Sequence, residues 1–290
     1  MTTLLHAPKH LPADRRRGRR WLTHLALIAG TLVMVYPLLW MLGGSFKDEK
    51  DIFSQLNPFP SSLNPHNYIA GWTATAPTFT RFYVNSLLIA VLAVAGNVIA
   101  CTLTAYAFAR LEFRGKKVFF GIMLGSIMLP AHALLIPQYV LFFNLGWVNT
   151  YLPLVVPKFL ATDAFFIFLM VQFIRTIPRT LDEAAMIDGC GKVRIFSRII
   201  LPLTGPVLIT TMIFTFIWTY NDFFSQLIYL SYPSSETVPV ALRRFVDATG
   251  ESSYGQLLAM SVLSLVPTFV VFLLAQRRIV EGIATTGLKG

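Results

Sequence analysis

The sequence predicts an all-α protein that crosses a membrane several times, and three observations support this prediction. Hydrophobic residues make up 55% of the 290 residues, charged residues only 13%, and the mean hydropathy is +0.62. A soluble globular domain carries about 25% charged residues, so this chain lacks the polar surface that a water-soluble fold of its size needs. Apolar stretches long enough to cross a bilayer recur along the chain, with basic residues clustered between them. Helices are predicted for these stretches because they satisfy every backbone polar group inside a bilayer.

The first apolar stretch follows a strongly basic N-terminus. Residues 1–20 contain a run of five arginines, and residues 21–43 are almost entirely apolar. A basic segment before an apolar one resembles a secretory signal, but this apolar run is too long for a signal core and long enough to span a bilayer. We therefore expect an uncleaved first transmembrane helix. Cleavage at the small residues 43–45 is the weaker alternative.

Five further spans are predicted, beyond a Pro-, Asn- and Ser-rich segment at 44–82. They cover residues 85–109, 118–135, 152–174, 203–228 and 257–275. Pro130 and Pro137 interrupt the third span, either as a packing kink or as an element of a pore, because a proline frees a backbone carbonyl that a neighbour or a wet cavity must satisfy. Six spans place both termini on the same side of the membrane.

The distribution of positive charge predicts the orientation. With the N-terminus inside, eighteen of the 24 lysines and arginines fall in cytoplasmic segments, and basic residues near spans are retained in the cytoplasm. Both termini are therefore expected in the cytoplasm, and the net charge of +10 needs no nucleic acid to explain it. The predicted organisation is a basic cytoplasmic N-terminus (1–20), a first transmembrane helix (21–43), an external loop (44–82), a core membrane domain with five transmembrane helices (83–276) and a cytoplasmic tail (277–290).

The cytoplasmic segment 175–204, between the fourth and fifth spans, predicts two short helices. Thr180 is placed to cap the first helix, and Glu183 stands three residues later, as in a capping box. Gly189 or Gly191 can end that helix in a left-handed turn. On helix physics alone, capping of its own helix is the favoured role for Glu183 over a contact outside the chain.

The same segment carries a spaced motif. It reads Glu-Ala-Ala, three residues, Gly, nine residues, Ile, one residue and Leu-Pro. The fixed positions are Glu183, Ala184, Ala185, Gly189, Ile199, Leu201 and Pro202. This pattern resembles the EAA motif of ABC importer permeases, and the chain is similar over most of its length to the six-span, maltose-permease-like subunits of the carbohydrate-uptake branch of type I importers. Further similar stretches are 128–146, 220–223 and 287–290.

The resemblance implies a fold, a function and partners. It implies the type I ABC importer permease fold in the plasma or inner membrane. It also implies half of a translocation pore for a sugar, an oligosaccharide or a related polyol or sugar phosphate. The partners would be a second homologous permease in a heterodimer, two copies of an ATP-binding subunit, an extracytoplasmic solute-binding protein and membrane lipid. The EAA loop would be the coupling helix that docks on the ATPase, through Leu181, Glu183, Ala184, Ala185, Asp188, Gly189, Leu201 and Pro202.

The chain itself carries no motif for catalysis. Gly191-Lys192-Val193 lacks the upstream glycine and the Ser or Thr of a phosphate-binding loop. No His, Cys and carboxylate cluster has metal-ligand spacing. We therefore expect no catalytic residue, no metal and no cofactor in this chain, with ATP and Mg²⁺ bound by the partner subunits.

Polar residues inside the predicted spans are the candidates for a translocation path. They are His132, Asp163, Asn221 and Asp222. Such groups are costly in lipid and mark functional sites by default, although hydrogen bonds between helices explain many of them. The C-terminal Leu288, Lys289 and Gly290 are either a frayed end or a contact to the ATPase pair.

Two other classes of protein are alternatives to an importer permease. An ion-coupled secondary transporter would account for six spans and for Asp163 or Asp222, but it leaves the EAA pattern without a role. An integral membrane enzyme would need a cluster of catalytic groups at one interface, which the sequence does not display.

Overall fold

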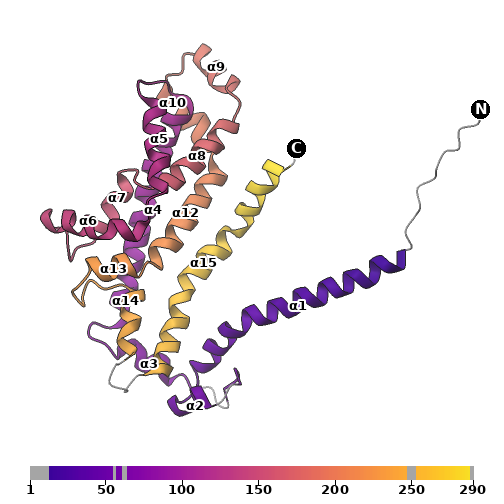
Figure 1. Cartoon of the computed structure of the whole chain (residues 1–290), viewed down its shortest axis with the longest axis vertical. Helices are drawn as coiled ribbons and strands as arrows, with labels where there is room; N and C mark the ends of the chain where they lie inside the picture. The colour runs from indigo at the N-terminus through magenta and orange to yellow at the C-terminus, as the bar shows by residue number, and fades with distance from the viewer. Residues whose placement is uncertain (1–12, 55–56, 61–63, 247–252, 288–290) are drawn as a thin grey trace, which may run out of the picture.

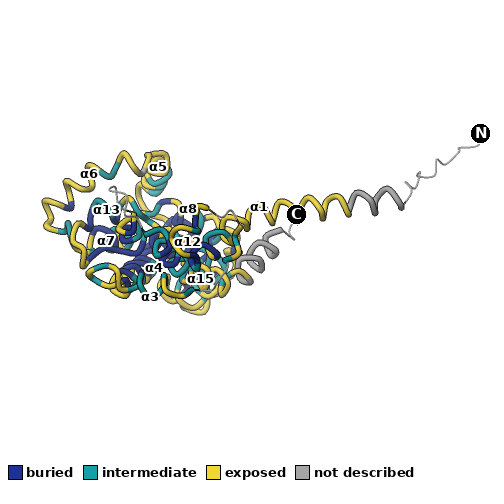
Figure 2. The backbone as a smooth tube through the Cα atoms, turned by 90° about the horizontal axis from the view of Figure 1, so that it is seen from below, coloured by how far each residue is buried: buried dark blue, intermediate teal, exposed yellow. Residues whose placement is uncertain are grey.

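Helix α4 (Phe79–Arg110) is the axis of the fold, and three other helices pack along it: α7 (Leu152–Phe159), α8 (Ala164–Thr176) and α12 (Gly205–Tyr220). The computed structural model describes residues 13–54, 57–60, 64–246 and 253–287. Within these residues the regular structure is entirely helical. Figure 2 shows the buried part of the backbone concentrated around α4, with α1, α5 and α6 largely exposed.

Small side chains explain why other helices approach α4 so closely. Ala90, Ala93, Gly96, Ala100 and Ala105 are all buried along it. A Cβ atom on Gly96 would lie 2.5 Å from the ring of Phe159 on α7. Interfaces of this kind are favoured between membrane helices, where close packing replaces the hydrophobic driving force. In mid-span, Asn97 Nδ2 donates to Thr215 Oγ1 at 2.7 Å, which joins α4 to α12 by an interhelical hydrogen bond.

Four helices of the described chain are long and apolar enough to span a bilayer: Trp21–Gly44, Phe79–Arg110, Leu152–Thr176 and Tyr254–Gln276. Two bent pairs also qualify if each counts as one span. These are Lys116–Ile127 with His132–Asn144, bent by 109°, and Lys192–Leu203 with Gly205–Tyr220, bent by 75°. The six predicted spans therefore correspond to four long helical segments and two sharply bent pairs.

The third span is not the continuous helix predicted over 118–135. It divides into α5 (Lys116–Ile127) and α6 (Ala131–Asn144), and Pro130 stands at the N-cap of α6 with ψ of 121°. Proline disfavours helical conformation in the residue before it, which is why α5 stops short of this position. Pro137, also expected to break the span, lies inside α6.

The fourth and fifth spans also differ from the prediction. The stretch 152–174 contains a break at 160–163, between α7 and α8, where Ala161 has a φ of 55°. The fifth span, predicted over 203–228, contains α12, a break at 221–223 and then the short helix α13 (Phe224–Tyr229). These interruptions expose backbone and polar side chains inside apolar stretches, which is tolerated only where protein or a wet cavity surrounds them.

The first and last helices diverge from the rest of the bundle (Figure 1). Helix α1 (Ala13–Gly44) contains the predicted first span and leaves large apolar side chains exposed, including Met34 at 81%. Helix α15 (Tyr254–Gly287) contains the sixth span and continues as helix through the first part of the predicted tail. Leu288, Lys289 and Gly290 lie outside the described residues.

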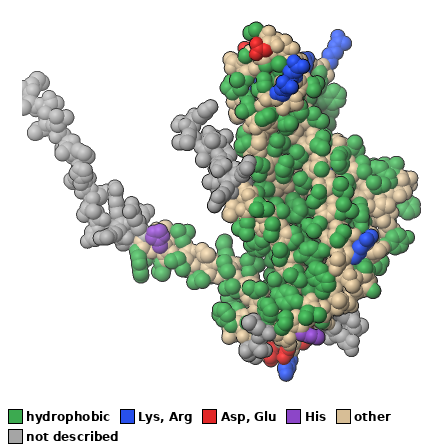
Figure 3. All heavy atoms as spheres, turned by 180° about the vertical axis from the view of Figure 1, so that it is seen from behind, with side chains coloured by type: hydrophobic (Ala, Val, Ile, Leu, Met, Phe, Trp, Pro, Cys, Tyr) green, Lys and Arg blue, Asp and Glu red, His purple; other side chains and the backbone are tan. Residues whose placement is uncertain are grey.

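The short helices gather at the two ends of the long ones. Helices α2 (Glu49–Ser54), α3 (His66–Thr73), α14 (Val238–Leu242) and η2 (Arg243–Phe245) lie at one end, and α9 (Thr180–Ile187) lies at the other. Figure 3 shows a face that is apolar over most of its height, with charged side chains mostly near the two ends. This distribution fits a bundle whose middle lies in lipid.

Candidate functional site

Helix α9 stands at the tip of the molecule and contains the Glu-Ala-Ala part of the motif (Figure 1). Its start differs from the prediction. The N-cap is Arg179, already in the right-handed helical region, and no side chain caps the helix. Thr180 is therefore the first helical residue, one position too late for its hydroxyl to act as the cap. The predicted capping by Thr180 and Glu183 is wrong.

The two faces of α9 have different surroundings. Asp182 and Ala185, three residues apart, are buried against the bundle. The outward residues are Leu181, Glu183, Ala184, Met186 and Ile187, of which Ile187 is 87% exposed. The small side chain of Ala185 serves packing inside this chain, because the residue belongs to the core cluster that also contains Ala105 and Ala109. A contact of Glu183 and Ala184 with a partner stays a prediction.

The turn after α9 follows one of the two predicted alternatives. Gly189 has a φ of +77°, the left-handed conformation that glycine adopts at low cost. Asp188 is the exposed C-cap residue, and Gly191 instead precedes α10 (Lys192–Ile195).

The end of the motif leads into the fifth span in an irregular way. From α10 the chain continues as the π-helix η1 (Phe196–Ile200) and then as α11 (Leu201–Leu203), which contains Leu201 and Pro202. The 75° bend lies at Thr204, between α11 and α12. The fifth span was predicted to start at residue 203, but α12 starts only after this bend.

Buried polar contacts attach α9 to the bundle. Arg110 Nε lies 3.2 Å from Asp182 Oδ2, and Arg110 Nη2 donates to the carbonyl oxygen of Ile177 at 2.6 Å. Tyr106 Oη donates to the carbonyl oxygen of Lys192 at 3.0 Å. Sequence reasoning missed all of these residues. In the sequence, Arg110 looks like one of many basic residues at the cytoplasmic side. Asp182 has no feature that separates it from the neighbouring Glu183.

The candidate path residues line two neighbouring cavities between α6, the α7–α8 break and α12–α13. The larger has a volume of about 700 Å³ and is lined by Asp163 and Asp222, among others. The smaller, about 430 Å³, is lined by His132, Asn221 and Asp222. The structure therefore brings all four predicted path residues to one region of the fold, although they come from three different spans.

Each of these four residues also has a contact within the chain. Asp163 forms an ion pair with Lys158, with Nζ and Oδ2 2.8 Å apart. Asp222 Oδ1 accepts a hydrogen bond from the backbone N–H of Ser225 at 3.1 Å, at the start of α13. Asn221 Nδ2 donates to the carbonyl oxygen of Ile217. The His132 ring contacts the ring of Phe224.

Two cavity residues were missed by the sequence analysis. Lys158 lies inside the fourth apolar stretch, and its pairing with Asp163 across the α7–α8 break could have been suspected from opposite charges five residues apart in an apolar run. Trp218 on α12 lines both cavities and is 52% exposed. An indole presents a flat apolar face with one polar edge, which suits it to a wet, partly apolar cavity.

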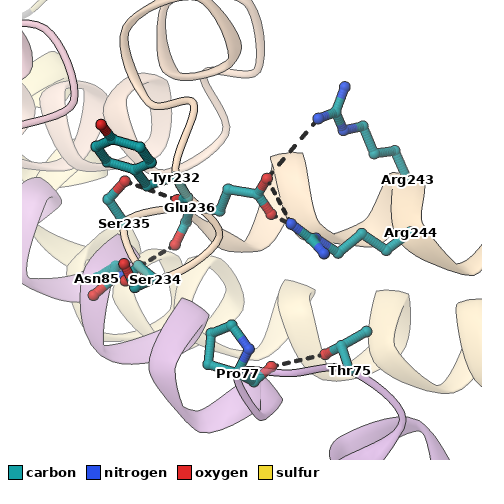
Figure 4. Close-up of polar contacts among 9 residues, drawn as sticks. All are labelled: Thr75, Pro77, Asn85, Tyr232, Ser234, Ser235, Glu236, Arg243 and Arg244. Atoms are coloured by element: carbon teal, nitrogen blue, oxygen red, sulfur yellow. Dashed lines mark hydrogen bonds and ion pairs between the residues drawn. The ribbon is translucent and has the colours of Figure 1, made fainter.

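At the opposite end, the loop between α13 and α14 is fixed by a buried carboxylate (Figure 4). Glu236 is 2% exposed and accepts two hydrogen bonds from Arg244, at 2.7 and 2.9 Å. Its backbone carbonyl accepts a hydrogen bond from Asn85 Nδ2 on α4 at 2.7 Å. The hydrogen bonds to Glu236 raise the pKa of Arg244 above its ordinary value. This bidentate pair, which sequence reasoning also missed, joins the loop to η2, and the hydrogen bond from Asn85 attaches the loop to α4.

Metal binding has no support in the described part of the chain. No group of three or more His, Cys, Asp and Glu side chains there could hold a metal ion.

A bundle of apolar helices, with broken spans around cavities that carry a few polar side chains and with an exposed motif helix at one end, is the architecture of a polytopic membrane protein. The chain belongs to the family of binding-protein-dependent transport system inner membrane components, whose model matches residues 96–280. This match contains α9, both cavities and most of α15.

Relatives and solved structures agree with this assignment. The chain is 33% identical over 287 residues to the probable ABC transporter permease protein YurM of Bacillus subtilis, covering 97% of this chain and 94% of the relative. It is 33% identical over 274 residues to the trehalose/maltose transport system permease protein MalG of Thermococcus litoralis, covering 93% and 98%. A chain of a bacterial ABC transporter that imports the acidic polysaccharide alginate has the same fold, with a TM-score of 0.79, 23% identity and coverage of 93% and 99%.

The ABC permease prediction is thus confirmed at the level of family and fold. The family and these relatives give no support to the ion-coupled secondary transporter weighed as the alternative.

Proposed function

We propose that the chain forms half of the translocation path of an ABC importer for a sugar, an oligosaccharide or a related polyol or sugar phosphate. Family membership supports the importer, and the trehalose/maltose permease among the relatives supports the substrate class. The observation that carries the proposal is α9, a motif helix with an exposed apolar and acidic face at one tip of the bundle. In this proposal the α9 end is cytoplasmic and both termini lie on that side.

The expected partners are assigned to surfaces that the described residues leave exposed. Glu183, Ala184 and Ile187 present the contact to one of two ATP-binding subunits, which bind and hydrolyse ATP with Mg²⁺. The opposite end, with α3 and the α13–α14 loop, receives the extracytoplasmic solute-binding protein. Helix α1, whose residues 21–39 are exposed, extends toward a second homologous permease and the surrounding lipid.

The cavities support a path for hydroxyl-rich solutes. Gln138 and Asp222 provide hydrogen-bonding groups in the larger cavity, and Trp218 and Tyr229 provide aromatic surface. Ligand sites in proteins are concave and mostly apolar, with a few polar groups that fix orientation. Asp163 and Lys158 add a charge pair at the break between α7 and α8.

Trp218→Leu is expected to lower solute uptake by about tenfold, because loss of one well-placed aromatic contact costs about 1–1.5 kcal/mol. Uptake per assembled transporter in proteoliposomes is the measurement. Met212→Leu on the same helix is the control, since Met212 is exposed and lines neither cavity, and it should stay within about twofold on the scale of a volume-conserving apolar substitution. Equal effects of the two substitutions would remove the cavity from the proposed path.

The energy source distinguishes an ABC importer, which is driven by ATP, from a secondary transporter, which is driven by an ion gradient. Proteoliposomes containing the purified complex should take up radiolabelled sugar only with ATP inside and solute-binding protein outside. Ionophores that collapse proton and sodium gradients should leave that uptake unchanged. Uptake by this chain alone, driven by an ion gradient without ATP, would contradict the proposal.

A further inference from the structure

The coupling segment, defined here as residues 178–200, is held on the end of α4 by one buried cation. Arg110 is the last residue of α4, and only 4% of its side chain is exposed. Its guanidinium reaches Asp182 on α9 and the carbonyl oxygen of Ile177 at the end of α8. A single side chain thus spans the junction of three helices.

A second contact one turn away reinforces this attachment. Tyr106, four residues before Arg110 and so on the same face of α4, donates its hydroxyl to the carbonyl oxygen of Lys192. The ring of Tyr106 also packs against that of Phe196, with centroids 4.9 Å apart. The helices α9, α10 and η1 of the coupling segment are therefore attached to adjacent turns of α4.

The geometry of the ion pair indicates that it positions α9 on α4 more than it stabilises the fold. Arg110 Nε approaches Asp182 Oδ2 to 3.2 Å without the alignment of a hydrogen bond, and Asp182 Oδ1 has no partner among the described residues. A buried ion pair of this kind gains little net stability, because desolvation offsets the attraction between the charges. It does fix the position of the carboxylate relative to a planar guanidinium.

Near its N-terminal end, α4 is attached to the α13–α14 loop, which lies at the end of the bundle opposite α9. Asn85 Nδ2 donates to the carbonyl oxygens of Ser234 and Glu236, and Ser86 Oγ accepts from the N–H of Val238. Helix α4 therefore has polar attachments at both ends, to the coupling segment and to the α13–α14 loop.

We propose that Arg110 is a positioning residue that makes α9 and α4 move as one body. Displacement of α9 by an ATPase subunit is then transmitted along α4 to the opposite end. This inference rests on the proposed function, in which α9 docks on the ATPase. Without the Arg110–Asp182 pair, α9 can shift on its apolar seat at Ala185, and ATP hydrolysis proceeds with less solute movement.

Two variants and one control test the proposal in the assembled transporter. Asp182→Asn leaves Arg110 buried without its counter-charge and is expected to lower the amount of assembled complex. The double variant Arg110→Met with Asp182→Leu removes both charges and keeps apolar bulk, so it should assemble normally. Glu112→Gln is the control, because Glu112 is an exposed acid just beyond the end of α4 that pairs with Lys116 on its own side of the bundle and with no other residue that the structure describes.

The decisive quantity is solute transported per ATP hydrolysed. The double variant is expected to lower this ratio at least about fivefold, the lower end of the usual range for coupling between sites. The Glu112→Gln control should keep the wild-type ratio. A purely structural role of the pair predicts a wild-type ratio in every complex that assembles, and that result would overturn the proposal.

A distance measurement gives a second readout. Spin labels at Thr180 on α9 and Leu103 on α4, both exposed, are introduced after Cys101 and Cys190 are replaced. We expect one narrow distance distribution without further substitution and a broader one in the double variant. Equal widths would contradict the proposal. If no ATPase subunit assembles with the chain, the proposed function fails, whereas an assembled transporter with an unchanged ratio and width rejects only the role of Arg110.

Discussion

Glu183→Ala is expected to reduce ATP-driven solute uptake by about tenfold to a hundredfold, because a hydrogen bond to a charged group contributes about 1.5–3 kcal/mol. Glu183 is exposed on the outer face of α9, and its side chain neither caps the helix nor bonds to another described residue. Its carboxylate is therefore available to a partner at no cost to this chain. Uptake per assembled complex in proteoliposomes measures the effect.

The fold should tolerate this substitution. Alanine is a better helix former than glutamate, and an exposed acid in the first turn of a helix contributes only about 0.3–1 kcal/mol. Membrane abundance and thermal stability of the variant should therefore remain near wild type. Glu112→Ala, which removes an exposed acid on the same side of the bundle, is the matched control. Wild-type uptake by Glu183→Ala would remove this residue from the ATPase contact.

Glu236→Ala is expected to loosen the α13–α14 loop strongly. The substitution leaves the partly buried Arg244 without its bidentate partner, and breaking a buried pair by removing one member costs about 3–5 kcal/mol. Backbone amides of residues 231–246 should then exchange with solvent at least about a hundredfold faster, since local opening sets the exchange rate. Hydrogen exchange followed by mass spectrometry of the detergent-solubilised protein is the measurement.

A neighbouring arginine supplies the control for this prediction. Arg243 lies 3.9 Å from the same carboxylate, but 54% of its side chain is exposed. Exposed ion pairs contribute about 0–1 kcal/mol, so Arg243→Ala should change the exchange rates by less than about fivefold. If Glu236→Ala left the loop as protected as Arg243→Ala does, the buried pair would not be what holds it.

Local chemistry made some features predictable from the sequence. Runs of apolar residues located the spans, since a bilayer requires about 20 of them in succession. The left-handed turn at Gly189 follows from the freedom of glycine at a helix end. The motif at 183–202 indicates the class of protein from the sequence alone. Asp163 and Asp222 could be selected as candidate path residues because charge is rare within a span, and their role in a path stays a prediction.

Contacts between distant segments were not predictable in this way. Length and apolarity do not distinguish a straight span from one bent by 109°, although Pro130 stands at the bend. Arg110 and Asp182 lie far apart in the sequence, and each resembles an ordinary solvated charge at a membrane surface. Glu236 and Arg244 are buried together only because their loop folds onto the end of α4. The wrong assignment of Thr180 as a cap has a local cause, since Arg179 already adopts helical geometry.

The central claim is that this chain is one half of an ATP-driven pore, and co-purification tests it most directly. The tagged chain is expressed together with its neighbouring genes, extracted in a mild detergent and captured, and the captured proteins are quantified by mass spectrometry. We expect one copy of a different permease and two copies of an ATP-binding subunit for each tagged chain. Recovery of the chain alone, or only with further copies of itself, would contradict that claim.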